Sequence, residues 1–351
     1  MCEDTMKLFQ RLLVAPAALG LMAPVAANAD SAFTSTTTLS GSAVFTVGSV
    51  ADGGNDDKQE ELYMQYAYSM DLNTSFTGED LLTAGIETGN AGEKTGTSAS
   101  PLAFMDSAAD GDSKLSVKSL YYAFPVGNLS VTAGPLVDAD DVIAATTSAY
   151  SDDFRLGSMP WSVNGDHTGP GIGIAFTGDN GFVASASFVS IDGNDAKVGI
   201  GGDKGDDVSV LSAGYNGEGW GLGLIMGSHD GDKTKANGGD SLGGGIYYSP
   251  ESIPATISVA YDTVDPELKG AKDSSDLFIG VDYEVGPGTL SAAYNSTDVD
   301  GGSSADSTGF EVSYSYAVND SLTITPGFFT VEDTSTGDDD SGVVVETVFS
   351  F

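Results

Sequence analysis

Apolar residues alternate with small or polar residues in many short segments of the chain. In the segment 308–318, Phe310 and Val312 occupy one set of positions, while Glu311 and Ser313 occupy the other. Side chains of a β-strand point alternately to its two faces, so this period of two predicts strands with one apolar face. The same pattern is found in segments 62–70, 255–263 and 276–285.

Sixteen such segments are present, and most of them span 10 to 14 residues. A strand tilted by about 40° needs roughly 10 residues to cross an apolar layer of about 25 Å, so these lengths suit membrane-crossing strands. We expect the strands near residues 37–50, 61–72, 74–88, 114–126, 128–138, 169–178, 181–192, 207–217, 219–230, 241–250, 254–265, 276–286, 287–298, 308–318, 321–332 and 342–351.

The connections between these segments alternate between short and long. The short ones contain Gly, Asn, Asp or Pro, which supply the backbone conformations of tight hairpins; they are 73–74, 127–128, 178–181, 216–219, 250–254, 286–288 and 319–320. The long ones are rich in Asp, Gly, Ser and Lys; they are 51–60, 89–113, 139–168, 193–206, 231–240, 266–275, 299–307 and 333–341. This alternation predicts an all-β fold, a 16-stranded antiparallel transmembrane β-barrel with both chain ends on the periplasmic side.

The N-terminal residues predict export. Lys7 and Arg11 precede an apolar run that ends in the small residues of Ala27-Asn28-Ala29. This order is typical of a cleaved secretory signal peptide, and the run is too short to cross a bilayer as a helix. We therefore expect a signal peptide at residues 1–29 and a single barrel domain at 30–351.

Composition narrows the partners. Whether the chain starts at Met1 or Met6 is open, but cleavage removes Cys2, its one cysteine, and with it any disulfide or cysteine metal site. The formal net charge of −38 would repel nucleic acids and anionic lipid surfaces. The mean hydropathy of −0.03 is compatible with a barrel, because only alternate residues of its strands face lipid.

The last predicted strand ends in an aromatic residue. Phe349 and Phe351 lie two positions apart and therefore on the same face. This ending resembles the terminal strand that bacterial outer-membrane proteins present to their barrel-assembly machinery. We expect an outer-membrane protein whose partners are that machinery, membrane lipid and lipopolysaccharide.

Four motifs between residues 114 and 190 carry a family resemblance. They are a "YYxFPVG" strand at 121–127, an "LxVTxG" strand at 129–134, an acidic "DxDD" stretch at 138–141 and a glycine-rich strand at 169–174. In these motifs the chain resembles the carbohydrate-selective (OprB-type) porins of cyanobacterial outer membranes. The resemblance implies a barrel of sixteen strands, usually trimeric, whose third loop folds inward and narrows a channel.

Two features depart from that family. Its cyanobacterial members usually carry an S-layer-homology domain before the barrel, whereas here the first predicted strand begins about ten residues after the expected cleavage site. Sugar-selective members also line the channel with arginines, whereas Arg155 is the single arginine that follows the signal peptide. We therefore do not predict carbohydrate selectivity, and expect passive diffusion of inorganic ions and small hydrophilic solutes.

The longest connection, 139–168, is the candidate for setting the size limit of the channel. We predict a short helix over 140–145, with acids at its positive N-terminal end. In one interpretation the acids line a constriction; these residues are Asp138, Asp140, Asp141, Asp152 and Asp153, with Arg155 paired to one of them. In the other interpretation the segment is a capped helix in a solvated loop.

The distribution of charge predicts a preference for cations. Nearly all lysines lie in the long connections, and Lys118 alone lies within a predicted strand. One charge about 10 Å from a wet channel axis contributes roughly 0.4 kcal/mol before screening, so several acids give a several-fold preference rather than exclusion. The acids expected to face the lumen are Asp262, Asp282, Glu284, Glu311 and Glu346.

No pattern favours catalysis, a cofactor or a metal site. A G-x-S-x-G match at 239–243 has no helix after it to form a nucleophile elbow. His167 and His229 are expected to be isolated and exposed in loops rather than to bind metal. Two alternatives to an open channel stay possible at this stage: a plugged barrel with a structural or adhesive role, and a secreted soluble β-rich adhesin.

Overall fold

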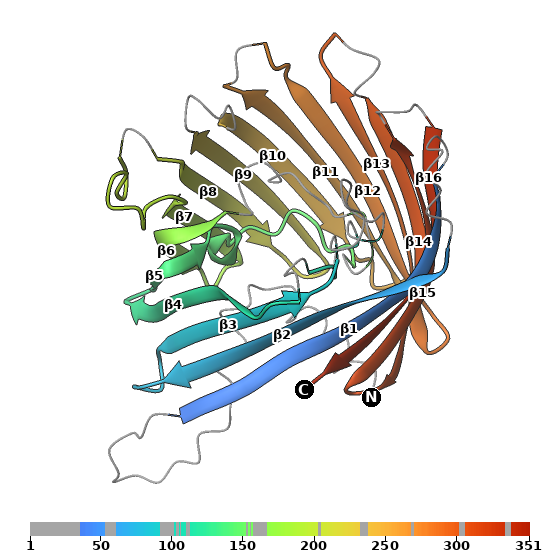
Figure 1. Ribbon diagram of the computed structural model, residues 1–351, viewed down its shortest axis with the longest axis horizontal. Helices are drawn as coiled ribbons and strands as arrows, with labels where there is room; N and C mark the ends of the chain where they lie inside the picture. The colour runs from blue at the N-terminus through green and yellow to red at the C-terminus, as the bar shows by residue number, and fades with distance from the viewer. Residues whose placement is uncertain are drawn as a thin grey trace.

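The fold is that of a computed structural model, which describes residues 36–52, 61–91, 102, 105, 107–109, 113–151, 154, 156, 167–202, 205–231, 238–267, 270–301, 306–333 and 338–351. These residues form sixteen strands that follow one another around a barrel wall (Figure 1). The strands are β1 (Thr36–Asp52), β2 (Tyr63–Ser75), β3 (Leu81–Gly89), β4 (Ser116–Val126), β5 (Leu129–Asp138), β6 (Thr168–Thr177), β7 (Phe182–Ser190), β8 (Asp207–Asn216), β9 (Trp220–Asp230), β10 (Gly239–Tyr248), β11 (Ala255–Pro266), β12 (Ser274–Val285), β13 (Gly288–Val299), β14 (Ser307–Asn319), β15 (Leu322–Asp333) and β16 (Asp338–Ser350).

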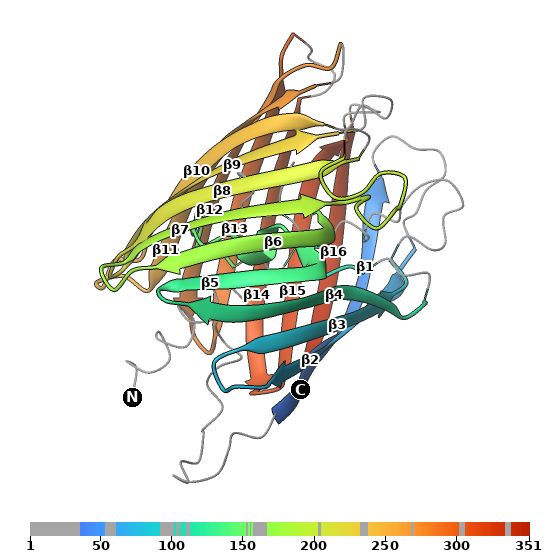
Figure 2. The ribbon, with the colours of Figure 1, turned by 90° about the vertical axis from the view of Figure 1, so that its left-hand side faces the viewer.

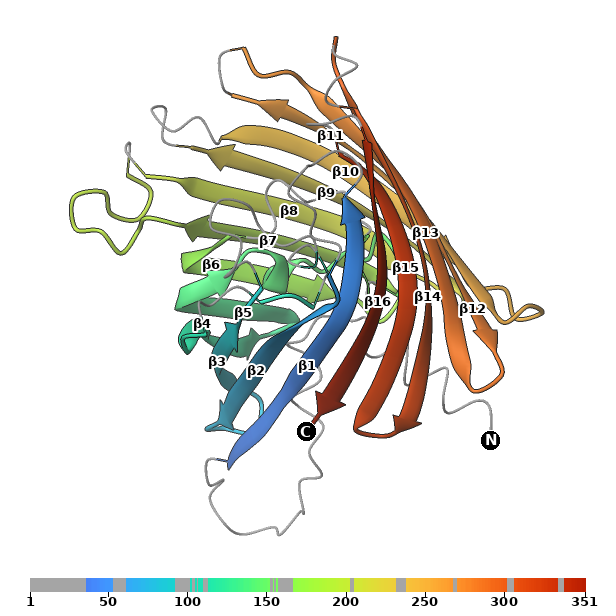
Figure 3. The ribbon, with the colours of Figure 1, turned by 45° about the vertical axis from the view of Figure 1, so that its right-hand side comes forward.

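The first and last strands close the barrel. Every strand pairs antiparallel with its neighbours in sequence, and β1 pairs with β16, which lies beside it in Figure 3. At the end of this seam Gly41 and Phe351 exchange both main-chain hydrogen bonds, at 3.0 and 3.1 Å. No strand edge is left unpaired, which satisfies the main-chain polar groups inside a bilayer. The predicted 16-stranded antiparallel barrel is confirmed.

The two faces of the wall differ as the alternation predicts. In β11, Ile257, Val259 and Tyr261 are 44%, 37% and 51% exposed on the outer face, whereas Ser258 and Asp262 at alternate positions are completely buried on the inner face. The outer face thus presents apolar side chains to lipid, while the inner face carries small and polar side chains together with buried apolar ones. Within the described parts of the chain, no helix combines the length and apolar character needed to cross a bilayer.

Six of the seven predicted tight connections lie where the sequence places them, and one prediction is wrong. The turn expected at residues 73–74 is part of β2, which continues to Ser75, and β3 starts only at Leu81. The carboxylate of Asp80 holds the intervening turn by accepting hydrogen bonds from the main-chain N–H groups of Phe76 and Thr77, at 2.9 and 2.8 Å. Asn73 instead accepts a cross-strand hydrogen bond from Thr83 (2.8 Å).

The two halves of the wall face each other across the interior. Figure 2 shows β4–β8 in front of β13–β16, and the segment after β5 runs between these walls. That segment starts with a single 3-10 turn, η2 (Asp140–Val142); Ile143 is extended, and no helix follows in the described residues up to 151. The predicted helix over 140–145 is therefore wrong beyond its first turn. The following main-chain N–H groups donate to side chains of the wall instead of to helix carbonyls.

Candidate functional site

The third long loop lies against the inner face of the barrel wall. We call its part from residue 139 to 156 the third-loop belt, of which 139–151, 154 and 156 are described. The N–H of Ala144 donates to the hydroxyls of Ser185 in β7 and Ser212 in β8, at 3.1 and 3.2 Å. The N–H of Ala149 donates to the hydroxyl of Ser258 in β11 (3.0 Å). Short wall side chains thus replace the hydrogen bonds that an extended loop cannot make within itself.

Carboxylates of the wall hold the second half of the belt. Asp282 in β12 accepts a hydrogen bond from the N–H of Ser151 (2.8 Å). Glu311 in β14 accepts one from the Tyr150 hydroxyl and one from the N–H of Leu156, both at 2.7 Å. Hydrogen bonds to ionised groups are stronger than neutral ones, so these two acids fix the belt across the far wall.

Glycines on the inner face let the belt approach the wall closely. A Cβ atom on Gly280 would lie 2.5 Å from the ring of Tyr150, and one on Gly223 would lie 2.8 Å from the carbonyl oxygen of Thr146. Such distances are shorter than non-bonded contacts allow, so any larger residue would displace the belt. We call this set the glycine track; it comprises Gly173, Gly214, Gly223, Gly245, Gly280, Gly309 and Gly327, which all contact belt residues.

Three apolar clusters lie inside the barrel, and the belt contributes to each. Its first part packs Val142 with Val189, Val208 and Ile225 of the wall. Its middle packs Tyr150 and Leu156 with Ala260, Phe278 and Ala293, and its end packs Phe154 with Phe329. Each fully buried apolar side chain contributes about 1.5–3 kcal/mol relative to exposure. The belt is therefore a packed part of the fold.

Leu102 and Met105 of the second long loop also pack inside the barrel, which the sequence did not reveal. Leu102 is fully buried, and its carbonyl accepts a hydrogen bond from Gln65 in β2. Ser107 donates a short hydrogen bond to Glu346 in β16. Leu102 and Met105 share a cluster with Phe154, so the second loop and the third-loop belt meet inside the barrel.

The acids predicted to line a constriction are only partly within the described chain. Asp138 ends β5 and accepts a hydrogen bond from Thr168 (2.7 Å), and Asp140 and Asp141 form the turn η2. Burial raises the pKa of the Asp141 carboxyl to about 6, and the nearby charges of Asp138 and Asp71 add to this effect. These acids thus lie together at the start of the belt. The remaining predicted members, Asp152, Asp153 and Arg155, lie outside the described residues.

The five acids assigned to the lumen occupy inner-face positions with different surroundings. Glu311 and Asp282 hold the belt, and Glu346 accepts hydrogen bonds from Thr46 (3.3 Å) and Ser107. Glu284 is exposed near the periplasmic end of β12. Asp262 is completely buried, and neither of its carboxylate oxygens has a hydrogen-bond partner.

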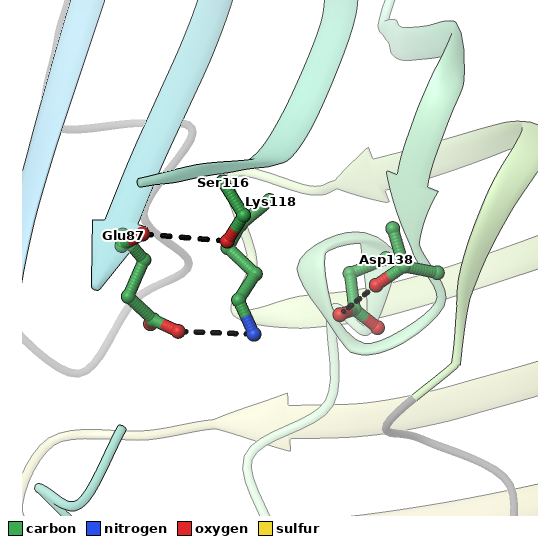
Figure 4. Close-up of polar contacts among 5 residues, drawn as sticks. Glu87, Ser116, Lys118 and Asp138 are labelled. Atoms are coloured by element: carbon green, nitrogen blue, oxygen red, sulfur yellow. Dashed lines mark hydrogen bonds and ion pairs between the residues drawn. The ribbon is translucent and has the colours of Figure 1, made fainter. Parts of the chain in front are cut away.

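Among the described lysines, Lys118 alone lies within a strand. Its ammonium group forms an ion pair of 3.0 Å with Glu87 of β3, as Figure 4 shows together with Ser116 and Asp138. A shift in register between Gly85 and Ile86, where β3 meets β4, places Lys118 at an irregularity of the sheet. The positive charge is therefore matched locally by an acid.

The contacts of the wall acids could not be read from the sequence. The sequence identifies Glu311 and Asp282 only as polar residues at alternate positions of predicted strands. Their partners are main-chain N–H groups of a loop, which carry no residue-specific pattern. The repeated inner-face glycines and serines were the available clue, because a wall that contacts only water has no need of such small residues.

Comparisons with known proteins identify the family of this barrel. The chain matches the family of Gram-negative porins over residues 15–347. A comparison with curated proteins found no matching sequence. Among solved structures the chain is similar to the OprB of Pseudomonas putida (10% identity, TM-score 0.65, covering 90% of this chain and 94% of that one). It is also similar to the OmpT of Vibrio cholerae (11%, 0.62, 92% and 99%) and to a mutant of the Rh. blastica porin (14%, 0.61, 90% and 100%).

At these identities the solved structures show the shared barrel fold alone. The family match covers nearly the whole chain, and it agrees with the closed sixteen-stranded wall and the inward third loop. The chain belongs to the Gram-negative porin family and is a non-enzymatic outer-membrane channel for the passive diffusion of solutes.

Proposed function

We propose that this porin prefers cations over anions among the small hydrophilic solutes it passes. The observation that carries the proposal is the ion pair of Lys118 with Glu87, at 3.0 Å, which balances the positive charge of this lysine. Asp138, Asp140 and Asp141 at the start of the belt then leave a surplus of negative charge beside the passage. A negative lumen attracts cations and repels anions.

The preference is moderate in size. One charge about 10 Å from a wet axis changes the energy of a monovalent ion by roughly 0.4 kcal/mol, which is about a twofold change in concentration. Screening over about 8 Å at physiological salt reduces this further. The acids of the belt together give a several-fold preference, and anions still pass.

Reversal potentials across a planar bilayer under a salt gradient test the proposal. Wild-type protein should give the sign of a cation-preferring channel. Lys118→Gln removes the positive charge and leaves Glu87, so it should increase the cation preference by up to about twofold, whereas Asp141→Asn should decrease it. Asp240→Asn is the matched control, because Asp240 is exposed on the outer face of β10 and should leave the potential unchanged. An anion-preferring wild type would refute the proposal.

Three finer points are part of the same proposal. We propose a homotrimer, removal of residues 1–29 on export, and kinship with the OprB-type porins. The family match supports the trimer, the basic residues and apolar run that end at Ala27-Asn28-Ala29 support the cleavage, and the motifs between 114 and 190 support the kinship. Mass measurement of the detergent complex and N-terminal sequencing of membrane-extracted protein test the first two points. A complex with the mass of one chain would refute the trimer, and an intact leader would refute the cleavage.

A further inference from the structure

The two histidines of this chain contact each other. The sequence contains no others, and the strands β6, β7 and β8 lie between them along the chain. The ring of His167, directly before β6, lies 4.8 Å from the ring of His229 in β9, measured between centroids, with the planes inclined by 55°. The expectation that His229 is exposed in a loop is wrong, because it belongs to a strand and is 3% exposed.

The surroundings of His229 leave one ring nitrogen unused. Its Nε2 atom is buried and has no hydrogen-bond partner. Burying an unpaired polar atom of this kind costs free energy, so most such atoms in folded proteins have a partner or a ligand. Acids also act electrostatically on this imidazole; they are Asp206, Asp230 and Glu267. His229 therefore has acidic residues near it at the outer end of the wall.

We propose that His167 and His229 bind one divalent transition-metal ion, of the class of Zn²⁺, Cu²⁺ or Ni²⁺. Imidazole is a preferred ligand of these ions, with metal–nitrogen distances of about 2.0–2.1 Å. Two imidazoles on one ion, at the tetrahedral angle or at adjacent corners of a square, place their centroids about 4.5–5.2 Å apart. The observed 4.8 Å falls in that interval.

The site has two protein ligands, and water completes the coordination. Among the described residues, no group of three or more His, Cys, Asp or Glu side chains is close enough to hold a metal. His167 remains partly exposed, which gives an ion access from the outer end. Binding is therefore reversible, and weaker than in a structural zinc site with four protein ligands.

Metal binding would fasten the end of the third loop to the wall. The carbonyl of His167 accepts a hydrogen bond from the N–H of Ala139 (3.1 Å), which joins the beginning of the loop to its end. An ion shared by His167 and His229 connects this junction to β9. Since an ion that binds only the folded state stabilises it, the metal should raise the temperature of unfolding.

Calorimetric titration of the folded full chain with Zn²⁺ and with Ni²⁺ tests the proposal, with Cu²⁺ electron paramagnetic resonance as a second readout. We expect one ion per chain and nitrogen hyperfine splitting from two imidazoles. His167→Ala, His229→Asn and the double variant should bind at least about tenfold more weakly and lose the splitting. Asp195→Asn, in the outer loop between β7 and β8, is the control and should bind as wild type does.

Each outcome of this experiment decides the matter. Heat-modifiable migration in detergent first shows that every variant is folded, and His167→Ala keeps the test valid if the buried His229 cannot be replaced. Saturable binding that the histidine variants lose supports the site. Binding that persists in the double variant would mean that the acidic loops hold the metal. No binding by wild type would mean that the two histidines only pack against each other. Either result overturns the proposal. Neither of these two measurements depends on channel activity.

Discussion

The Tyr150 hydroxyl donates a hydrogen bond of 2.7 Å to the carboxylate of Glu311, joining the third-loop belt to β14. The second oxygen of the same carboxylate accepts the N–H of Leu156 (2.7 Å). One wall acid therefore fixes two points of the belt. Because the belt lies inside the barrel, the position of Glu311 influences the width of the passage.

Removing this acid should widen the channel. Glu311→Ala leaves the Tyr150 hydroxyl and the Leu156 N–H without their partner, at a cost of about 1–3 kcal/mol for each buried donor. We expect the belt to loosen, and sugars of larger size to enter protein-containing liposomes faster than with wild type in a swelling assay. Asp179→Asn, in an exposed periplasmic turn, is the control. Identical swelling rates for folded Glu311→Ala and wild type would show that this acid does not hold the belt.

Two adjacent glycines of β10, of which only Gly245 belongs to the glycine track, should respond differently to replacement by alanine. A Cβ on Gly245 would overlap the carbonyl of Thr147 in the belt. One on Gly244 would meet the end of the Leu224 side chain at 2.7 Å and the carbonyl oxygen of Gly223 at 3.0 Å, and neither of these belongs to the belt. Gly245→Ala should lower the stability by about 1–3 kcal/mol through overpacking and alter the conductance. Gly244→Ala should lower the stability less and leave the conductance unchanged, because its contacts lie outside the belt. Urea unfolding followed by tryptophan fluorescence measures the stabilities, and equal effects of the two changes would argue against a belt in contact with the wall.

Two inner-face aspartates should respond differently to the same substitution. Asp282 accepts hydrogen bonds from Ser151 (2.8 Å) and Ser291 (2.6 Å), whereas the buried carboxylate of Asp262 has no hydrogen-bond partner. Asp282→Asn should therefore lower the unfolding temperature, by the equivalent of about 1–3 kcal/mol. Asp262→Asn replaces a buried carboxyl that has no hydrogen-bond partner and lies opposite the carboxyl of Asp276 in β12, so it should leave the unfolding temperature unchanged or raise it. The temperature at which the heat-modifiable band converts measures both, and a larger loss in Asp262→Asn would be contrary to this account.

The cation preference should depend on pH through Asp141. The pKa of this carboxyl is raised to about 6, first by burial and then by its acidic neighbours, so it is negative above that pH and neutral below it. The preference should fall by up to about twofold between pH 7 and pH 5. Reversal potentials measured at both pH values check this, with Asp141→Asn showing a smaller change. A preference that increases on acidification would contradict the assignment.

The turn between β2 and β3 should lose stability in acid. Burial alone would raise the pKa of Asp80, but hydrogen bonds from Tyr122, Thr77 and Ser75 outweigh it and hold the pKa well below its ordinary value. Because the folded-state pKa is depressed, this stabilisation is present above about pH 4 and is lost as the pH falls further. Asp80→Asn should lower the unfolding temperature at pH 7 and reduce its acid dependence. Unchanged unfolding at both pH values would refute this role.

The sequence predicted the wall well because strand faces obey a period of two and tight turns need particular residues. It failed at residues 73–74, where Asn73 has the composition of a turn but bonds across the strands to Thr83. It also predicted a longer helix after Asp140, since only the wall serines reveal where the later N–H groups donate. The contact of His167 with His229 depends on the register of distant strands, which periodicity does not determine.

The central claim is a water-filled passage through a wall that the third-loop belt narrows. Single-channel recording after insertion of the folded chain into a planar bilayer tests it most directly. The account predicts discrete conductance steps that grow in proportion to salt concentration, together with a cation-preferring reversal potential. Folded, heat-modifiable protein that inserts into the bilayer and gives no steps would contradict it.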